Sequence, residues 1–126
     1  YTPQSINALG GHRIQGRGDE GRERMIDEAR RLEAAGVFAI VLELIPGDLA
    51  KEISSAISVP TIGIGAGAGC DGQVLVLHDM LGLNTTFSPR FLRRFANLAE
   101  DASRAVQDYV RAVKEGEYPA PEHTFA

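Results

Sequence analysis

The chain has 126 residues, of which 44% are hydrophobic and 24% charged, and its formal net charge at pH 7 is −4. This length suits one small domain, and the composition is ordinary for a globular protein. The acidic balance argues against nucleic acid or an anionic membrane as the main partner, because either would require a basic surface.

The sequence predicts a cytoplasmic protein. The longest apolar run, VFAIVLELI, is much shorter than the ~20 residues that a membrane-spanning helix needs, and no charged-then-apolar signal segment opens the chain. The single cysteine, Cys70, cannot form an internal disulfide, as is usual in a reducing compartment. Because the chain begins at Tyr1 without an initiator methionine, we expect it to be processed, truncated or excerpted.

A loop and a helix are predicted at the start of the chain. Residues 1–19 are rich in glycine and polar residues, which indicates a long loop with one short helical turn over 3–9. Apolar residues then recur at spacings of three and four, which predicts a helix over 20–35. Asp19 is expected to be its N-cap, and Gly36 is expected to end it.

Two buried strands are predicted next. The run over 37–44 is β-branched and apolar on both faces, which is typical of a strand buried on both sides in a parallel sheet. Pro46 ends it, and a short helix follows over 48–57. The run over 59–66 predicts the second strand, which leads into the glycine-rich turn GAGAGCDG.

A third strand and a long helix complete the predicted elements. The apolar run over 73–81 predicts another strand followed by a turn, although a short helix also fits. A long apolar stripe predicts a helix over 89–114, with Pro89 in its first turn and Gly116 at its end. The closing tail is irregular.

The alternation of strands and helices predicts an α/β fold with parallel strands and right-handed crossovers. Three such strands make a poor closed domain, because both faces and both edges of the sheet need covering. A (β/α)₈ barrel needs roughly 250 residues, so the chain has the length of about half a barrel.

Glu43 is the main candidate for chemistry. It lies at the C-terminal end of the first strand, where the catalytic groups of α/β barrels are found. Leu42, Leu44 and Ile45 around it would shield its carboxylate from water and strengthen it as a base. The alternative is that Glu43 only marks where the strand emerges into solvent, or that it pairs with an arginine.

The glycine-rich turn after the second strand is a weaker candidate. Glycines at such a position let the backbone approach a ligand and expose N–H groups to an anion. As a dinucleotide motif it is poor, because no long helix directly follows it, and a tight turn is the commoner explanation. The sequence also has no histidine or cysteine spacing typical of a zinc site.

Several motifs, in order and spacing, resemble those of ketopantoate hydroxymethyltransferases. They are TPQSIN, GGHRIQGRGDE, LEAAGVFAIVLELIP, VPTIGIGAG, CDGQVLVLHDMLG and EYPAPEHTF, which together span essentially the whole chain. The succession of QGRGDE, VLELIP, GIGAG and DGQVLV is far more specific than any one piece.

The resemblance implies a (β/α)₈ barrel in which residues 1–126 are the C-terminal part of a single domain, with strands 6, 7 and 8 and their helices. It implies transfer of a hydroxymethyl group from 5,10-methylenetetrahydrofolate to 3-methyl-2-oxobutanoate, which gives 2-dehydropantoate on the way to pantothenate and coenzyme A. Family members use Mg²⁺ and form homo-oligomers, commonly decamers.

The resemblance also assigns residue roles. Glu43 corresponds to the general base at the end of strand 6, which removes the C3 proton of the keto acid, while Mg²⁺ holds the enolate charge. Gly65, Ala66 and Gly67 would line the barrel mouth near substrate or folate. The magnesium-binding acids belong to earlier strands, so we expect no metal site in this chain and no activity without the missing N-terminal half of the barrel.

Two other hypotheses stay open. One is a different barrel enzyme that makes carbon–carbon bonds on 2-oxo acids, of the phosphoenolpyruvate mutase and isocitrate lyase type, which substrate trials would separate. The other is a degenerate half-barrel that serves as a scaffold, which predicts no activity even when the N-terminal half is supplied.

Overall fold

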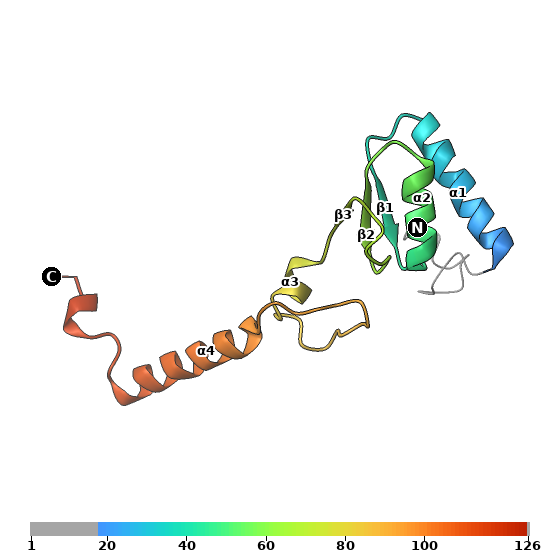
Figure 1. Ribbon diagram of the computed structural model, residues 1–126. Helices are drawn as coiled ribbons and strands as arrows, with labels where there is room; N and C mark the ends of the chain where they lie inside the picture. Colours follow the sequence, from blue (N-terminus) through green and yellow to red (C-terminus); the bar gives the residue numbers. More distant parts are fainter. Residues whose placement is uncertain (1–17, 126) are drawn as a thin grey trace. The chain divides into compact units, whose positions relative to one another are not determined.

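The computed structural model describes residues 18–125 and divides them into two compact units, one ending at Leu75 and the other beginning at Val76. The predicted turn over 3–9 lies outside the described residues. The first unit contains α1 (Asp19–Ala34), β1 (Ile40–Glu43), α2 (Gly47–Ala56), β2 (Thr61–Ile64) and β3 (Gly72–Gln73) (Figure 1). The second contains α3 (Leu77–Met80), α4 (Leu98–Glu115) and the 3-10 turn η2 (Pro121–His123). That all 126 residues belong to one barrel domain stays a prediction.

Helix α1 begins one residue earlier than predicted. Gly18 is its N-cap, and Asp19 is its first helical residue, so the prediction that Asp19 caps the helix is wrong. A carboxylate is favourable both at the N-cap and in the first turn, because free N–H groups lie at this end of the helix. The sequence pattern therefore does not distinguish the two positions. Gly36, with a φ of +89°, follows the C-terminal end as predicted.

The three strands form one parallel sheet in the order β1-β2-β3, which confirms the predicted α/β class with parallel strands. Ile40 pairs with Thr61 at the start of β1, and Glu43 pairs with Ile64 at its end. Strands β1 and β2 are joined through α2, and this helix matches the prediction to within one residue at each end.

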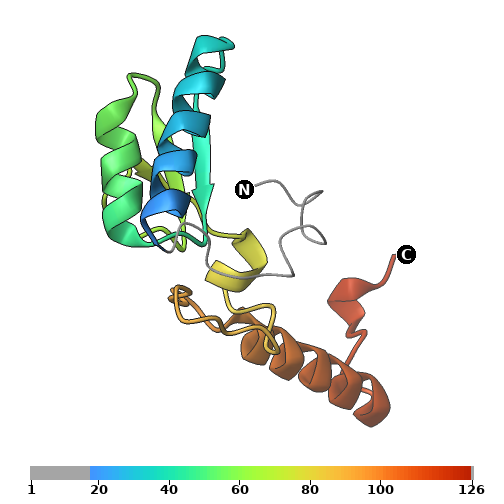
Figure 2. The ribbon, with the colours of Figure 1, turned by 90° about the vertical axis from the view of Figure 1, so that its right-hand side faces the viewer.

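Helices α1 and α2 lie side by side and cover the same face of the sheet (Figures 1 and 2). Ile40 and Leu42 of β1 point into the core beneath them, whereas Val41 between them is 53% exposed. The prediction that this strand is buried on both sides is therefore wrong for the part of the chain that the structure describes, because the helices cover one face only.

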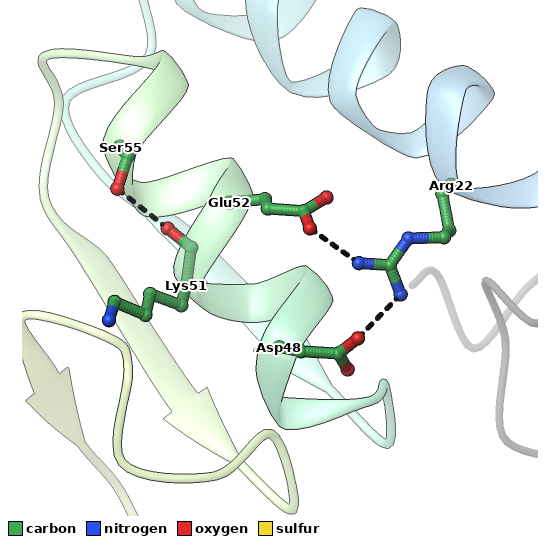
Figure 3. A network of polar contacts seen from close by, with 5 residues as sticks. All are labelled: Arg22, Asp48, Lys51, Glu52 and Ser55. Carbon is green, nitrogen blue, oxygen red and sulfur yellow. Dashed lines mark hydrogen bonds and ion pairs between the residues drawn. The ribbon is translucent and has the colours of Figure 1, made fainter. Parts of the chain in front are cut away.

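Ionic contacts hold α1 against α2 at the solvent side of this layer (Figure 3). Arg22 of α1 donates from Nη1 to Asp48 Oδ2 at 2.8 Å and from Nη2 to Glu52 Oε1 at 2.6 Å. These hydrogen bonds lower the pKa of Asp48 and raise that of Arg22. Below the contacts lies a hydrophobic core formed by Met25, Ala29, Ile40, Leu42, Ile45, Leu49, Ala50, Ile53 and Ala66.

The prediction of a third strand over 73–81 is largely wrong. Strand β3 comprises only Gly72 and Gln73, and the later part of the run forms the short helix α3, as the alternative interpretation held. Val74 and Val76 are about half exposed, at 44% and 53%. These apolar side chains therefore lack the burial that normally stabilises a strand.

The long helix begins at Leu98, not near Pro89 as predicted. Before it, the backbone is engaged elsewhere: the Phe95 N–H donates to the Met80 carbonyl, and Arg94 donates to the carbonyl oxygens of Asn84 and Phe87. These non-helical contacts take the place of the helical hydrogen bonds that the apolar periodicity predicted. Gly116, with a φ of +74°, ends α4 as predicted.

Helix α4 has no buried residue, and its apolar face is exposed at Val106, Tyr109, Val110 and Val113. Across residues 18–125, every helix is too short or too polar to cross a membrane.

Candidate active site

Glu43 is the last residue of β1, at the carboxyl end of the parallel sheet. Side chains alternate along a strand, so Glu43 and Val41 point to the face that α1 and α2 leave uncovered. The side chain is half-buried. Strand β1 thus directs a carboxylate toward the open face of the sheet.

An open groove of about 810 Å³ lies along β1. Apolar side chains line most of it, including Met25 and Leu32 of α1 and Val41 of β1, and Glu43 lies in its wall. β1 pairs with β2 on one side, and within residues 18–125 no strand pairs with its other side. The candidate base therefore lies beside a mostly apolar surface at a free edge of the sheet.

The residue after Glu43 has an unusual backbone conformation. Leu44 has a φ of +52°, in the left-handed region that residues with a side chain rarely adopt. Its N–H donates to the Ile64 carbonyl at 3.0 Å, which extends the pairing of β1 with β2 by one residue. The turn brings Ile45, only 4% exposed, into the core.

The glycine-rich turn follows β2 directly beside Glu43, because Glu43 and Ile64 are partners in the sheet. Gly65 and Gly67 have φ values of +64° and +72°, so this turn requires glycine for its backbone shape. Ala66 between them is fully buried in the core. The predicted binding roles of Gly65, Ala66 and Gly67 stay predictions; the buried side chain of Ala66 contributes to packing.

The turns after β1 and β2 touch each other. A Cβ atom on Gly67 would lie 2.9 Å from the Cα atom of Gly47, closer than real Cβ contacts. On the other side of the turn, Gln73 Nε2 donates to the Gly67 carbonyl at 2.9 Å. Sequence reasoning missed Gly47 and Gln73, and it gave Leu44 a shielding role but not its backbone conformation. Pro46-Gly47 signals a turn, but nothing in the sequence pairs Gly47 with a glycine twenty residues later.

A second polar cluster closes the loop between β2 and β3. The backbone N–H and Oγ1 of Thr61, which is fully buried, donate to Asp71 Oδ2 at 2.8 and 2.9 Å. Ser54 Oγ lies 2.6 Å from Thr61 Oγ1. The hydrogen bonds from Thr61 hold the pKa of Asp71 below its ordinary value of 3.8. This carboxylate is committed to structure at the amino end of β2, whereas Glu43 lies at the carboxyl end of β1.

Replacing Asp71 by Asn is expected to make the protein less stable at neutral pH but not in acid. A carboxyl group with a lowered folded-state pKa stabilises the fold above its ordinary pKa, and this contribution is lost as the pH falls through the folded value. The difference in thermal midpoint between the wild type and Asp71→Asn should thus be largest near pH 6. It should disappear below the pKa of Asp71 in the folded protein. A gap that stayed constant into acid would contradict the charged role of Asp71.

Within residues 18–125, no three His, Cys, Asp or Glu side chains are grouped so as to hold a metal ion. Cys70 is partly exposed, and its Sγ would lie 3.0 Å from a Cβ atom on Gly63. The candidate site in this chain is therefore a carboxylate and two interlocked turns at the carboxyl edge of a parallel sheet.

Comparison with known proteins identifies the family. The family model for ketopantoate hydroxymethyltransferase matches residues 1–121. The chain belongs to this family. Curated relatives named 3-methyl-2-oxobutanoate hydroxymethyltransferase, a transferase, include proteins of Kosmotoga olearia, Enterococcus faecalis and Thermotoga neapolitana, which are 55%, 52% and 54% identical over 124 residues. The match covers 98% of this chain and 45–46% of each of these relatives. The chain thus spans a little less than half the length of the ketopantoate hydroxymethyltransferases that it matches.

Proposed function

We propose that the complete protein containing this chain transfers a hydroxymethyl group from 5,10-methylenetetrahydrofolate to 3-methyl-2-oxobutanoate, with Glu43 as the general base. The product is 2-dehydropantoate, which lies on the route to pantothenate. Membership of the family supports a one-carbon transfer to this keto acid. The observation that carries the role of Glu43 is its position at the carboxyl end of β1, on the uncovered face and beside the glycine turn.

In the proposed reaction, Glu43 removes a weakly acidic proton from a carbon atom. Its carboxylate takes the proton from C3 of the keto acid, and the electron pair of that C–H bond passes into the enolate. C3 forms the new bond to the methylene carbon of the folate. The two C–N bonds of that carbon break, so that tetrahydrofolate leaves with a proton on each nitrogen, and water supplies the oxygen of the new hydroxyl group. A carboxylate is suited to this task when it lies within hydrogen-bond reach of the proton that it abstracts.

Magnesium is expected for this family, but the donors in residues 18–125 do not fit a magnesium site. Mg²⁺ prefers an octahedral set of oxygen ligands, including carboxylates, and the part of the chain that the structure describes groups no three acidic side chains. We propose that the magnesium ligands lie in the part of the relatives that this chain does not cover.

We further propose that this chain is the C-terminal part of a (β/α)₈ barrel, with strands 6 to 8 and their helices. The free edge of β1, the apolar groove beside it and the uncovered face at Val41 support the view that more strands complete the sheet. The partner is then the N-terminal half of the barrel. Assembly of the completed protein into a homo-oligomer, commonly a decamer, and a cytoplasmic location complete the proposal.

The isolated chain is expected to catalyse no exchange of the C3 proton of 3-methyl-2-oxobutanoate. It carries the base but neither the metal ligands nor most of the substrate site. The measurement is proton NMR of the keto acid in D₂O with Mg²⁺, made in parallel with the complete protein. Exchange by the isolated chain would contradict the proposed division of the site, and no exchange by the complete protein would contradict the proposed reaction.

A further inference from the structure

The direction of the Glu43 carboxylate depends on the turn that follows it. Beyond Glu43, one hydrogen bond, from the Leu44 N–H to the Ile64 carbonyl, continues the pairing of β1 with β2. The left-handed backbone of Leu44 then turns the chain toward Pro46 and Gly47. The end of β1 is therefore held by its pairing with β2 and, further along the chain, by the contact that Gly47 makes.

Gly47 lies against the backbone of Gly67. A Cβ on Gly67 would lie 2.9 Å from the Gly47 Cα atom, whereas a Cβ on Gly47 would lie 3.4 Å from the Gly67 Cα atom, at the lower limit of ordinary contact. The fit is thus tightest on the side of Gly67. Both turns contribute backbone atoms only, so their distance has no flexible side chain to absorb a change.

Gln73 holds the other side of the same turn. Its Nε2 donates to the Gly67 carbonyl at 2.9 Å, so strand β3 holds the glycine turn from the side away from β1. Contacts run from Gln73 through Gly67 to Gly47, and the chain segment between Gly47 and Leu44 connects them to Glu43. None of the first three residues has a group suited to acid–base chemistry at carbon.

We infer that Gly67 and Gln73 are positioning residues for Glu43, and this inference rests on the proposed function. They fix the turn after β1 and thereby the place of the carboxylate relative to C3 of the keto acid. Proton abstraction requires the base within hydrogen-bond reach of the proton, and a misplacement of about 1 Å costs on the order of a hundredfold in rate.

The test uses the complete enzyme, with kcat and KM for 3-methyl-2-oxobutanoate and the kinetic isotope effect of the C3-deuterated keto acid. For Gly67→Ala we expect kcat to fall about tenfold or more, with KM changing much less. The isotope effect should rise, because proton abstraction becomes the slow step. Gln73→Met removes the hydrogen bond without a clash, and we expect kcat to fall roughly threefold with the same rise in isotope effect.

Two further variants separate positioning from general damage. In Gly47→Ala, the new Cβ atom would lie 3.4 Å from the Gly67 Cα atom, so this variant should lower kcat less than Gly67→Ala does. Gly36→Ala introduces a side chain at a φ of +89° with nothing within 4 Å, far from the turns in sequence, and should leave kcat and the isotope effect unchanged.

The outcomes are distinguishable. Wild-type kcat and isotope effect in both Gly67→Ala and Gln73→Met would overturn the inference, and if Gly67→Ala does not fold, Gln73→Met decides alone. An active wild-type enzyme with unaffected variants contradicts only the positioning role. A wild-type enzyme that neither exchanges the C3 proton nor transfers the hydroxymethyl group contradicts the proposed function, and the inference falls with it.

Discussion

Replacing Glu43 by Gln in the complete protein is expected to abolish C3 proton exchange and to lower kcat for hydroxymethyl transfer roughly 10²- to 10⁴-fold. The amide has nearly the shape of the carboxylate but cannot accept the proton from carbon. Because Glu43 lies at the end of β1 on the uncovered face, its replacement leaves the core untouched. The measurement combines deuterium incorporation at C3 with the rate of product formation.

Glu23→Gln is the matched control for this experiment. It makes the same chemical change at an exposed position of α1. Exchange and transfer should stay at the wild-type level, and the oligomeric state of both variants should match that of the wild type. If Glu43→Gln kept the wild-type exchange rate, another group would have to be the base.

Replacing Leu49 by Ala is expected to lower the free energy of unfolding by about 3 kcal/mol. Leu49 of α2 is completely buried in the core between the helices and β1. Its truncation removes buried methyl groups and leaves a cavity that the surrounding side chains cannot fully close. Denaturant unfolding followed by circular dichroism measures the change.

Lys51→Ala is the control for the stability experiment, because it lies on the same helix with its side chain exposed. It keeps the Cβ atom that packs near Gly69 and removes only atoms in solvent. We expect a change within about 0.5 kcal/mol. Equal losses in the two variants would contradict the assignment of the effect to the buried core.

The parallel sheet and the position of Glu43 could be predicted from the sequence because both depend on local patterns. A short apolar run that ends in a carboxylate just before Pro46 identifies a strand end, and the structure places Glu43 there. The short helix over Gly47–Ala56 follows from its own apolar spacing in the same way.

Features that depend on partners distant in the sequence could not be predicted in this way. The run after Gln73 has the composition of a strand, but too few neighbours bury Val74 and Val76 for a strand to form. The predicted helix near Pro89 is displaced to Leu98 because the preceding backbone binds carbonyl groups of the α3 region. The contact of Gly47 with Gly67 likewise arises only when two turns meet.

The backbone at Leu44 restricts which amino acids are acceptable beside the candidate base. Isoleucine, valine and threonine, whose branched Cβ atoms fit poorly at a φ of +52°, should be rejected there, whereas glycine and asparagine should be accepted. A substitution table that treats isoleucine as the nearest replacement for leucine therefore ranks the variants of this position in the wrong order. We therefore expect backbone shape to limit the residues accepted at position 44 more strictly than hydrophobicity does.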